Sequence, residues 1–234
     1  MLFRQLYDNE TSTYTYLIAD ENTKEAALVD PVIEQVERDL KLIQELGLNL
    51  RYCLETHIHA DHVTGTGKLR ELTSCEGLVP ENAKVACANR CIKDGEILKV
   101  GEIEIKTITT LGHTDSHNSY LVNQNLLLTG DSLFIRGCGR TDFQSGNPGL
   151  MYDHVTQKLF TLPDQTLVYP GHDYRGHSVS TIGEEKQFNP RFVGKNRDQF
   201  IQLMNNLNLP DPKKIAEAVP ANQKCGNVSA MVEV

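Results

Sequence analysis

The chain has 234 residues, of which 39% are hydrophobic and 23% charged, and its formal net charge at pH 7 is −8. This length suits one large domain with a substantial core, and the acidic balance offers nucleic-acid phosphates no basic surface. No stretch reaches the roughly 18 apolar residues that a membrane-spanning helix needs. We therefore expect a soluble cytoplasmic protein with no nucleic-acid or membrane partner, or a mitochondrial matrix protein if a leader has been removed. The six cysteines form no CxxC pair, and we expect reduced thiols.

The first half of the chain predicts several strands and two helices. A helix is expected from about residue 31 to 46, because Pro31 suits a first helical turn and Gly47 suits the end. A shorter helix is expected over residues 67–72. Apolar runs between turn residues predict strands over residues 3–7, 14–19, 26–29, 50–55 and 83–86.

The second half predicts further strands over 97–100, 103–109, 119–122, 126–129 and 167–169, with a helix over 147–160. Strands in clusters with helices between them favour an α/β fold class with two mixed sheets packed together and helices outside. We expect a metal-binding catalytic domain in residues 1–178. A mostly helical extension, packed on the same domain, is expected in residues 179–234.

One short segment concentrates residues that bind metals. Four of the six residues after Thr56 carry ligand-type side chains, and they directly follow a predicted strand: His57, His59, Asp61 and His62. Loops at strand ends are where a rigid scaffold presents functional groups. With eight histidines in the whole chain, three within six residues point to a metal site rather than to a polar loop.

Three single residues occupy similar places elsewhere in the chain. His113, Asp131 and His172 each come shortly after a predicted apolar strand, and each directly follows a glycine. Glycine allows a sharp turn or a close approach of the backbone to a metal. The repeated order of strand, glycine and ligand-type residue predicts that these loops converge with the histidine-rich segment on one metal-dependent active site.

These motifs resemble those of the metallo-β-lactamase superfamily. The matching pieces run from Thr56 to His62 and continue in Gly112-His113-Thr114, Thr129-Gly130-Asp131 and Gly171-His172-Asp173, in the order of that superfamily. The resemblance implies an αββα sandwich of two mixed β-sheets flanked by helices, with the metal at the sheet edge. It does not decide the reaction, because this fold supports several chemistries.

Two further segments resemble the persulfide dioxygenase branch, namely residues 135–144 and the closing residues 209–215. The resemblance implies that one Fe(II) per chain binds His57, His113 and Asp131, and that sulfur and O2 use the open metal positions. The residues His59, Asp61, His62 and His172 would lie around the metal and support catalysis without binding it. The implied reaction oxidises glutathione persulfide to sulfite and glutathione.

The carboxylates of glutathione need cationic or hydroxyl partners. We expect these from Arg136, Arg140, Tyr174 and Arg191, with Arg140 favoured because it follows a metal ligand by nine residues. An ion pair between Arg140 and Asp142 is an equally good interpretation. Tyr174 resembles the tyrosine that contacts glutathione in glyoxalase II relatives.

Two other functions fit the same residues. A glyoxalase II-type thioester hydrolase would use all seven ligand-type residues for two zinc ions or an Fe/Zn pair. A non-catalytic metal- or sulfur-binding partner of a sulfurtransferase is the second alternative. For the dioxygenase, we expect any sulfurtransferase to be a separate protein, and a homodimer is one possible assembly.

Overall fold

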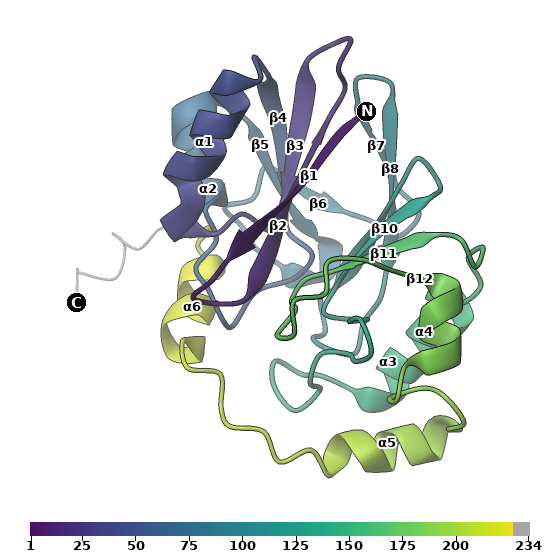
Figure 1. Ribbon diagram of the computed structural model, residues 1–234. Coiled ribbons are helices and arrows are strands. Elements are labelled where there is room, and N and C mark those ends of the chain that lie inside the picture. The colour runs from purple at the N-terminus through teal and green to yellow at the C-terminus, as the bar shows by residue number, and fades with distance from the viewer. Residues whose placement is uncertain (227–234) are drawn as a thin grey trace. The chain divides into compact units, whose positions relative to one another are not determined.

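The computed structural model describes residues 1–226, which contain two six-stranded sheets and six α-helices (Figure 1). These residues divide into two compact units. The first unit comprises Met1–Ile92, Lys99–Ile103 and the chain from Pro210, and the second comprises Lys93–Leu98 and Glu104–Leu209. Nowhere in residues 1–226 is a helix long and apolar enough to cross a membrane. The predicted boundary near residue 178 stays a prediction, and residues 227–234 of the expected extension lie outside the described residues.

The sheet of the first unit is mixed. Its first three strands pair antiparallel, and parallel pairing then continues from β3 to β6. β2 and most of β3 are buried along their length, as expected for strands covered on both faces. In sheet order the strands are β1 (Leu2–Asp8), β2 (Thr13–Ala19), β3 (Glu25–Val29), β4 (Asn49–Leu54), β5 (Glu76–Pro80) and β6 (Arg90–Ile92).

Helices α1 (Val36–Glu45) and α2 (Thr66–Thr73) lie together on one side of this sheet (Figure 1). Their apolar residues form one core cluster with β2, β3 and β4, which includes Leu28, Ile43 and Leu69. The helix predicted over residues 31–46 is confirmed, although it opens with a 3-10 turn, η1 (Ile33–Gln35). The third helix of the unit is α6 (Ile215–Asn222).

The strand predicted over residues 83–86 is wrong. A 3-10 turn, η2 (Glu81–Ala83), ends there, and Lys84 has a left-handed backbone with φ of 53° that interrupts a strand. Three strands of the described residues were not predicted, namely β5 (Glu76–Pro80), β6 (Arg90–Ile92) and, in the other sheet, β12 (Ser180–Thr181). Gly77 in β5 weakens a strand pattern, but it is needed because a Cβ there would lie 2.7 Å from Thr66 Cγ2 of α2.

The second sheet is also mixed. β10 pairs parallel with β11, whereas β9 pairs antiparallel with β10 and β12 pairs antiparallel with β11. In sheet order its strands are β12 (Ser180–Thr181), β11 (Leu167–Pro170), β10 (Leu126–Gly130), β9 (Asn118–Val122), β8 (Ile103–Thr109) and β7 (Ile97–Val100). Asn147 caps α3 (Pro148–His154), which continues as a π-helical turn over Val155–Leu159. Together with α4 (Ile182–Phe188) and α5 (Arg197–Asn205), these helices supply the second unit's apolar core.

The cysteines are not all reduced, so the expectation of free thiols is wrong for one pair. Cys87 and Cys225 form a disulfide within the first unit across a sequence separation of 138 residues. Cys53, Cys75, Cys91 and Cys138 are free, as expected. A bond across so many residues has no local sequence pattern, which is why spacing alone did not predict it.

Asp39 predicts a pH-dependent stability. This residue lies in α1 and is 1% exposed. Burial raises its pKa from 3.8 to about 6, although Arg38 beside it opposes the shift. The folded state therefore holds the proton more tightly than the unfolded state. The contribution of the protonated Asp39 carboxyl to the stability of the folded state is complete below pH 4 and is lost as the pH rises to about 6. We expect Asp39→Asn to remove this slope and to raise the free energy of unfolding at pH 7 by about 2 kcal/mol.

Urea denaturation at pH 4, 5, 6 and 7 checks this expectation. Glu37→Gln, an exposed carboxylate on the same helix, is the matched control and should keep the slope of the unchanged protein. An Asp39→Asn protein with that same slope would contradict the assignment.

Candidate metal centre

In the first unit, the loop after β4 fixes the ring of His57. Thr56 Oγ1 donates to Asp30 Oδ2 at 2.8 Å, so it can only accept at its other contact, 2.9 Å from His57 Nδ1. His57 therefore carries its proton on Nδ1 and keeps the lone pair of Nε2. A neutral imidazole with its second nitrogen fixed by a hydrogen bond is the form that binds a metal.

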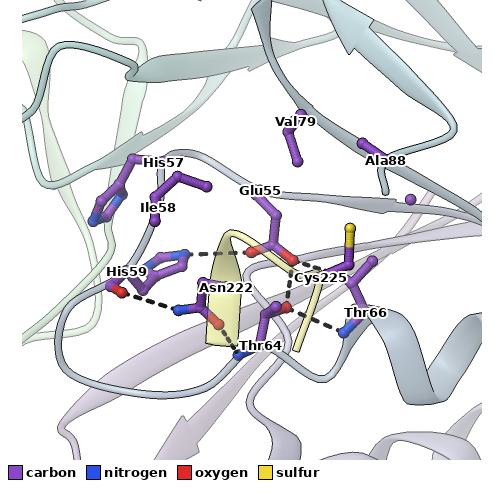
Figure 2. Close-up of a pocket in the computed structure, with 11 residues that line it drawn as sticks. Glu55, His57, Ile58, His59, Thr64, Thr66, Val79, Ala88, Asn222 and Cys225 are labelled. Carbon is purple, nitrogen blue, oxygen red and sulfur yellow. Dashed lines mark hydrogen bonds and ion pairs between the residues drawn. The ribbon is translucent and has the colours of Figure 1, made fainter. Parts of the chain in front are cut away.

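His59 is held by two buried carboxylates. Its Nε2 lies 3.0 Å from Asp30 Oδ1 and 3.4 Å from Glu55 Oε2. Burial alone lowers the pKa of His59, but Asp30, Glu55 and Asp61 outweigh it and hold that pKa well above its ordinary value. The rings of His57 and His59 lie with centroids 4.1 Å apart (Figure 2). This arrangement makes His59 a fixed hydrogen-bonding group rather than a mobile side chain.

Asp61 and His62 form a pair beside it. His62 Nδ1 donates to Asp61 Oδ2 at 2.8 Å, and Thr13 Oγ1 donates to the same oxygen at 3.1 Å. His62 Nε2 is buried and has no hydrogen-bond partner among the described residues. The ligand atoms of His59, Asp61 and His62 lie within 4.8 Å of one another, and His57 stands beside His59. The four ligand-type residues of the segment after Thr56 therefore form one cluster in the first unit.

In the second unit, His113 and Asp131 face each other. His113 Nδ1 donates to the carbonyl oxygen of Arg140 at 2.7 Å, which leaves the lone pair on Nε2. This Nε2 lies 3.4 Å from Asp131 Oδ2, and Asp131 Oδ1 is buried with no hydrogen bond from any described residue. A lone pair directed at a carboxylate is unfavourable unless a cation or proton lies there, so this pair fits a metal ion.

Asp131 is positioned by His117. The backbone N–H of Asp131 donates to His117 Nε2 at 3.0 Å, and His117 Nδ1 contacts Thr110 Oγ1 at 2.9 Å and Ser132 Oγ at 3.1 Å. His117 is fully buried. It therefore holds the backbone of a metal-ligand candidate and is not itself directed at the metal.

Two glycines allow close packing around this pair. A Cβ at Gly139 would lie 2.6 Å from the carbonyl oxygen of Asp131 and 2.9 Å from His113 Nδ1. A Cβ at Gly171 would lie 2.6 Å from Asp131 Oδ1. No side chain fits at either position without displacing a candidate ligand.

His172 completes this half of the centre. Its Nε2 lies 3.7 Å from Asp131 Oδ1, and Phe134 lies edge-on to the ring. Tyr174 stacks on His172 with an interplanar angle of 7° and is 70% exposed. Tyr174 therefore offers its hydroxyl group toward solvent beside the candidate ligands.

The three arginines expected to bind substrate differ in their surroundings. Arg136 pairs with Glu184 at 2.7 Å and with Glu185, whose side chain is fully buried. Arg140 pairs through two nitrogens with the half-exposed carboxylate of Asp142, at 2.6 and 2.7 Å, and lowers the pKa of that carboxyl. The backbone N–H of Arg191 donates to Asn189 Oδ1 at 3.0 Å.

Comparisons with known proteins agree on one family. The model of the metallo-beta-lactamase superfamily matches residues 8–172. Persulfide dioxygenase ETHE1, mitochondrial, from Mus musculus is 46% identical over 97% of this chain and 89% of its own length. The crystal structure of ETHE1 from Myxococcus xanthus superimposes with a TM-score of 0.94 at 54% identity and covers 97% of this chain and 100% of that chain. The chain belongs to the persulfide dioxygenase family of the metallo-β-lactamase superfamily.

This membership confirms the predicted resemblance, the fold class of two mixed sheets flanked by helices, and an enzymatic sulfur dioxygenase as the main function. The hydrolase alternative corresponds to a more distant relative. Hydroxyacylglutathione hydrolase from Rhodospirillum rubrum is 34% identical over 73% of this chain and 66% of its own length. The assignment of individual residues to metal and substrate stays a prediction.

The residues that hold the candidate ligands were not predicted from the sequence, namely Asp30, Glu55, His117 and Asn222. Asp30 and Glu55 directly follow β3 and β4, so their position after a strand could have marked them, but neither follows a glycine as His113 and Asp131 do. Asn222 lies more than 150 residues from its partners in the segment 57–64, the histidine loop, and no local pattern marks it.

Proposed function

We propose that the protein oxidises glutathione persulfide with O2 to sulfite and glutathione, and that one Fe(II) binds His57, His113 and Asp131. The single observation that carries this proposal is the similarity to persulfide dioxygenases named ETHE1 over 97% of the chain. The candidate ligands of both units lie in the segments that resemble the motifs of the superfamily, namely residues 56–62, 112–114, 129–131 and 171–173.

The protonation of the ligands supports the metal assignment. His57 and His113 each carry a proton on Nδ1 that a protein oxygen accepts, so both offer Nε2 as a neutral donor. Two imidazoles and one carboxylate suit Fe(II) and leave coordination positions at which sulfur and dioxygen can react. The chain's own contribution is to fix these two tautomers before the metal binds.

The contacts of Asp61 favour one metal over two. One oxygen of its carboxylate already accepts hydrogen bonds from His62 Nδ1 and Thr13 Oγ1. We infer that Asp61 orients His62 and is not a ligand to a second ion. His59 and His172 then act as hydrogen-bonding groups near the reacting sulfur and oxygen, with Asp30 keeping His59 in place.

The ion pairs rank the substrate-binding candidates. Arg136 compensates the buried carboxylate of Glu185, so releasing it to substrate would leave a buried charge unpaired. Arg140 pairs with an exposed aspartate, and a carboxylate of glutathione could replace that partner at little cost. Arg140 and Tyr174 are therefore the strongest candidates for glutathione binding, and Arg191 and Arg136 follow.

The mouse and human relatives carry the word mitochondrial in their names, and we extend a mitochondrial matrix location to this chain as part of the proposal. A separate sulfurtransferase would then deliver sulfur as the persulfide of a small thiol. A homodimer belongs to the same proposal.

Oxygen uptake by Fe(II)-reconstituted protein with glutathione persulfide tests this function, with sulfite measured in the same sample. We expect sulfite to match oxygen consumed, and His113→Ala to lower the rate at least about 100-fold through loss of a ligand. His177→Ala is the matched control, since this histidine is about half exposed and its Nδ1 lies 4.0 Å from Asp173 Oδ1. Absence of uptake by metal-loaded protein, together with hydrolysis of S-lactoylglutathione, would transfer the assignment to the thioester hydrolase.

A further inference from the structure

The side chain of Asn222, the last residue of α6, binds backbone atoms of the histidine loop. Its Oδ1 accepts from the Thr64 N–H at 2.8 Å, and its Nδ2 donates to the carbonyl oxygens of His59 at 2.9 Å and His62 at 2.8 Å. The side chain is 3% exposed, and both of its polar atoms are used (Figure 2). A single amide thus fixes the path of the chain across the loop that carries three of the predicted site residues.

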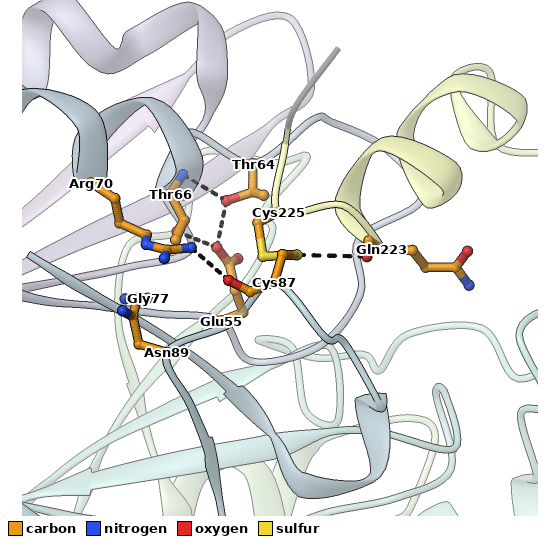
Figure 3. Close-up of a disulfide and its surroundings, with 9 residues drawn as sticks. All are labelled: Glu55, Thr64, Thr66, Arg70, Gly77, Cys87, Asn89, Gln223 and Cys225. Atoms are coloured by element: carbon orange, nitrogen blue, oxygen red, sulfur yellow. Dashed lines mark hydrogen bonds between the residues drawn. A yellow bond between two sulfur atoms is a disulfide. The ribbon is translucent and has the colours of Figure 1, made fainter. Parts of the chain in front are cut away.

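The disulfide lies three residues beyond Asn222. Cys225 bonds to Cys87, which lies between η2 and β6, and Figure 3 shows this bond beside Thr64 and Glu55. Gly226 packs so closely that a Cβ there would lie 2.2 Å from the carbonyl oxygen of Thr64. The covalent bond therefore anchors the end of α6 at the point where it touches the histidine loop.

Other contacts of α6 are weaker in kind. Ala218 and Ala221 pack on Val63 in a small apolar cluster, and Lys214 pairs with Glu10 and Glu34 on the surface. Small alanine contacts and exposed ion pairs contribute little each. Reduction of the disulfide would leave α6 attached by these contacts, by Asn222 itself and by Val219, which packs against the cluster of Ile58, Val79 and Val85.

We propose that the Cys87–Cys225 disulfide is a thiol-sensitive site that controls the histidine loop, and that Asn222 is the positioning residue through which it acts. Cys225 is 4% exposed whereas Cys87 is partly exposed, so a small thiolate attacks Cys87 Sγ. The new bond joins that sulfur to the thiol, the bond to Cys225 breaks, and the Cys225 thiolate leaves and takes up a proton. A second thiol then releases Cys87 as its thiolate and forms the oxidised dimer of the small thiol.

The proposed function would supply a thiol that can open this disulfide, and this link alone rests on the proposed function. Each turnover of a persulfide dioxygenase with glutathione persulfide releases glutathione, a thiol of the required class. Accumulated product would open the disulfide, loosen the loop and weaken metal binding. Metal affinity would thus depend on the concentration of the thiol.

Hydrogen exchange of metal-free protein tests the structural step without any assay of turnover. We expect reduction by a phosphine to speed amide exchange in residues 57–66 about tenfold or more, with exchange in α5 unchanged. The rate of metal loss to a chelator, measured with Co(II), should rise by a similar factor in Cys225→Ser. Cys91→Ser, which removes an exposed free thiol, is the matched control and should match the unchanged protein in both measurements.

Asn222 is tested by combining its variants with reduction. In Asn222→Ala the loop should exchange fast already in the oxidised protein, and reduction should add less than about twofold. Asn222→Gln keeps the amide but displaces it by one methylene, so it should give an intermediate rate and serves if the alanine variant does not fold. Six titratable thiols in air-oxidised protein, or equal loop exchange before and after reduction, would overturn the proposal. An undiminished response to reduction in both Asn222 variants would overturn the role of Asn222. None of these outcomes depends on whether the enzyme oxidises persulfides.

Discussion

Gly139→Ala is expected to weaken metal binding about 10- to 100-fold, as large as the loss of a residue that orients a ligand. The added Cβ would lie 2.6 Å from the carbonyl oxygen and 3.0 Å from the Cβ of Asp131, and 2.9 Å from His113 Nδ1. Backbone and ring atoms cannot move aside as the end of a flexible side chain can. Since the carbonyl oxygen of the next residue, Arg140, accepts the hydrogen bond from His113 Nδ1, the displacement also disturbs the tautomer of that ligand. Calorimetric titration of metal-free protein with Fe(II) under anaerobic conditions measures the effect.

Gly137→Ala in the same short segment is the matched control. A Cβ at Gly137 would lie 3.6 Å from Phe134 Cβ, which is an ordinary contact, and the variant should bind metal as the unchanged protein does. Gly171→Ala approaches Asp131 from the loop after β11, with its Cβ 2.6 Å from Oδ1, and should reproduce the loss. Normal affinity in Gly139→Ala and Gly171→Ala would show that Asp131 and His113 are not the ligands.

The parts of the centre that could be predicted from the sequence are those with local patterns. His57, His59, Asp61 and His62 lie within six residues, and their position after a strand is visible as an apolar run. The strands that were missed are short: β6 has three residues and β12 has two, and β5 contains Gly77 and Pro80, which weaken a strand pattern. β5 forms by pairing with β4, and β6 forms by pairing with β5, and no single segment encodes these pairings.

Supporting residues were harder to predict because their role depends on burial. An aspartate after a strand, such as Asp30, usually belongs to a turn, and only the fold shows that it is buried against the histidine loop. No local pattern marks the role of His117, and only the fold shows that its Nε2 accepts a hydrogen bond from the backbone N–H of Asp131. The partners of Asn222 and the bond between Cys87 and Cys225 require chain segments far apart in the sequence.

Asp30 accepts three hydrogen bonds that organise the histidine loop. Its Oδ1 accepts from the Thr56 N–H at 2.7 Å and from His59 Nε2 at 3.0 Å, and its Oδ2 accepts from Thr56 Oγ1 at 2.8 Å. The backbone φ of Asp30 is 52°, a left-handed conformation that asparagine also tolerates. Asp30→Asn therefore keeps the backbone and the shape of the side chain and changes only the charge and one acceptor.

We expect Asp30→Asn to lower the free energy of unfolding at pH 7 by about 2–4 kcal/mol, because at least one buried donor loses its acceptor. Metal affinity should also fall about 10- to 100-fold. If Thr56 Oγ1 no longer donates to residue 30, it can donate to His57 Nδ1, and the proton of His57 then moves to Nε2, where a metal must bind. Urea denaturation of metal-free protein and anaerobic Fe(II) titration measure the two effects.

Asp39→Asn is the matched control, since it makes the same chemical change at another buried aspartate of this unit, which lies in α1. Asp39 Oδ2 is buried and accepts no hydrogen bond from any residue up to 226, so neutralising it should stabilise the fold and leave metal affinity unchanged. The two variants are thus expected to move stability in opposite directions at pH 7. The sign follows from how many donors surround each carboxylate, because a buried charge is favourable only where hydrogen bonds replace the water it has lost. Equal stability changes of one sign in both variants would show that the network around Asp30 does not organise the centre.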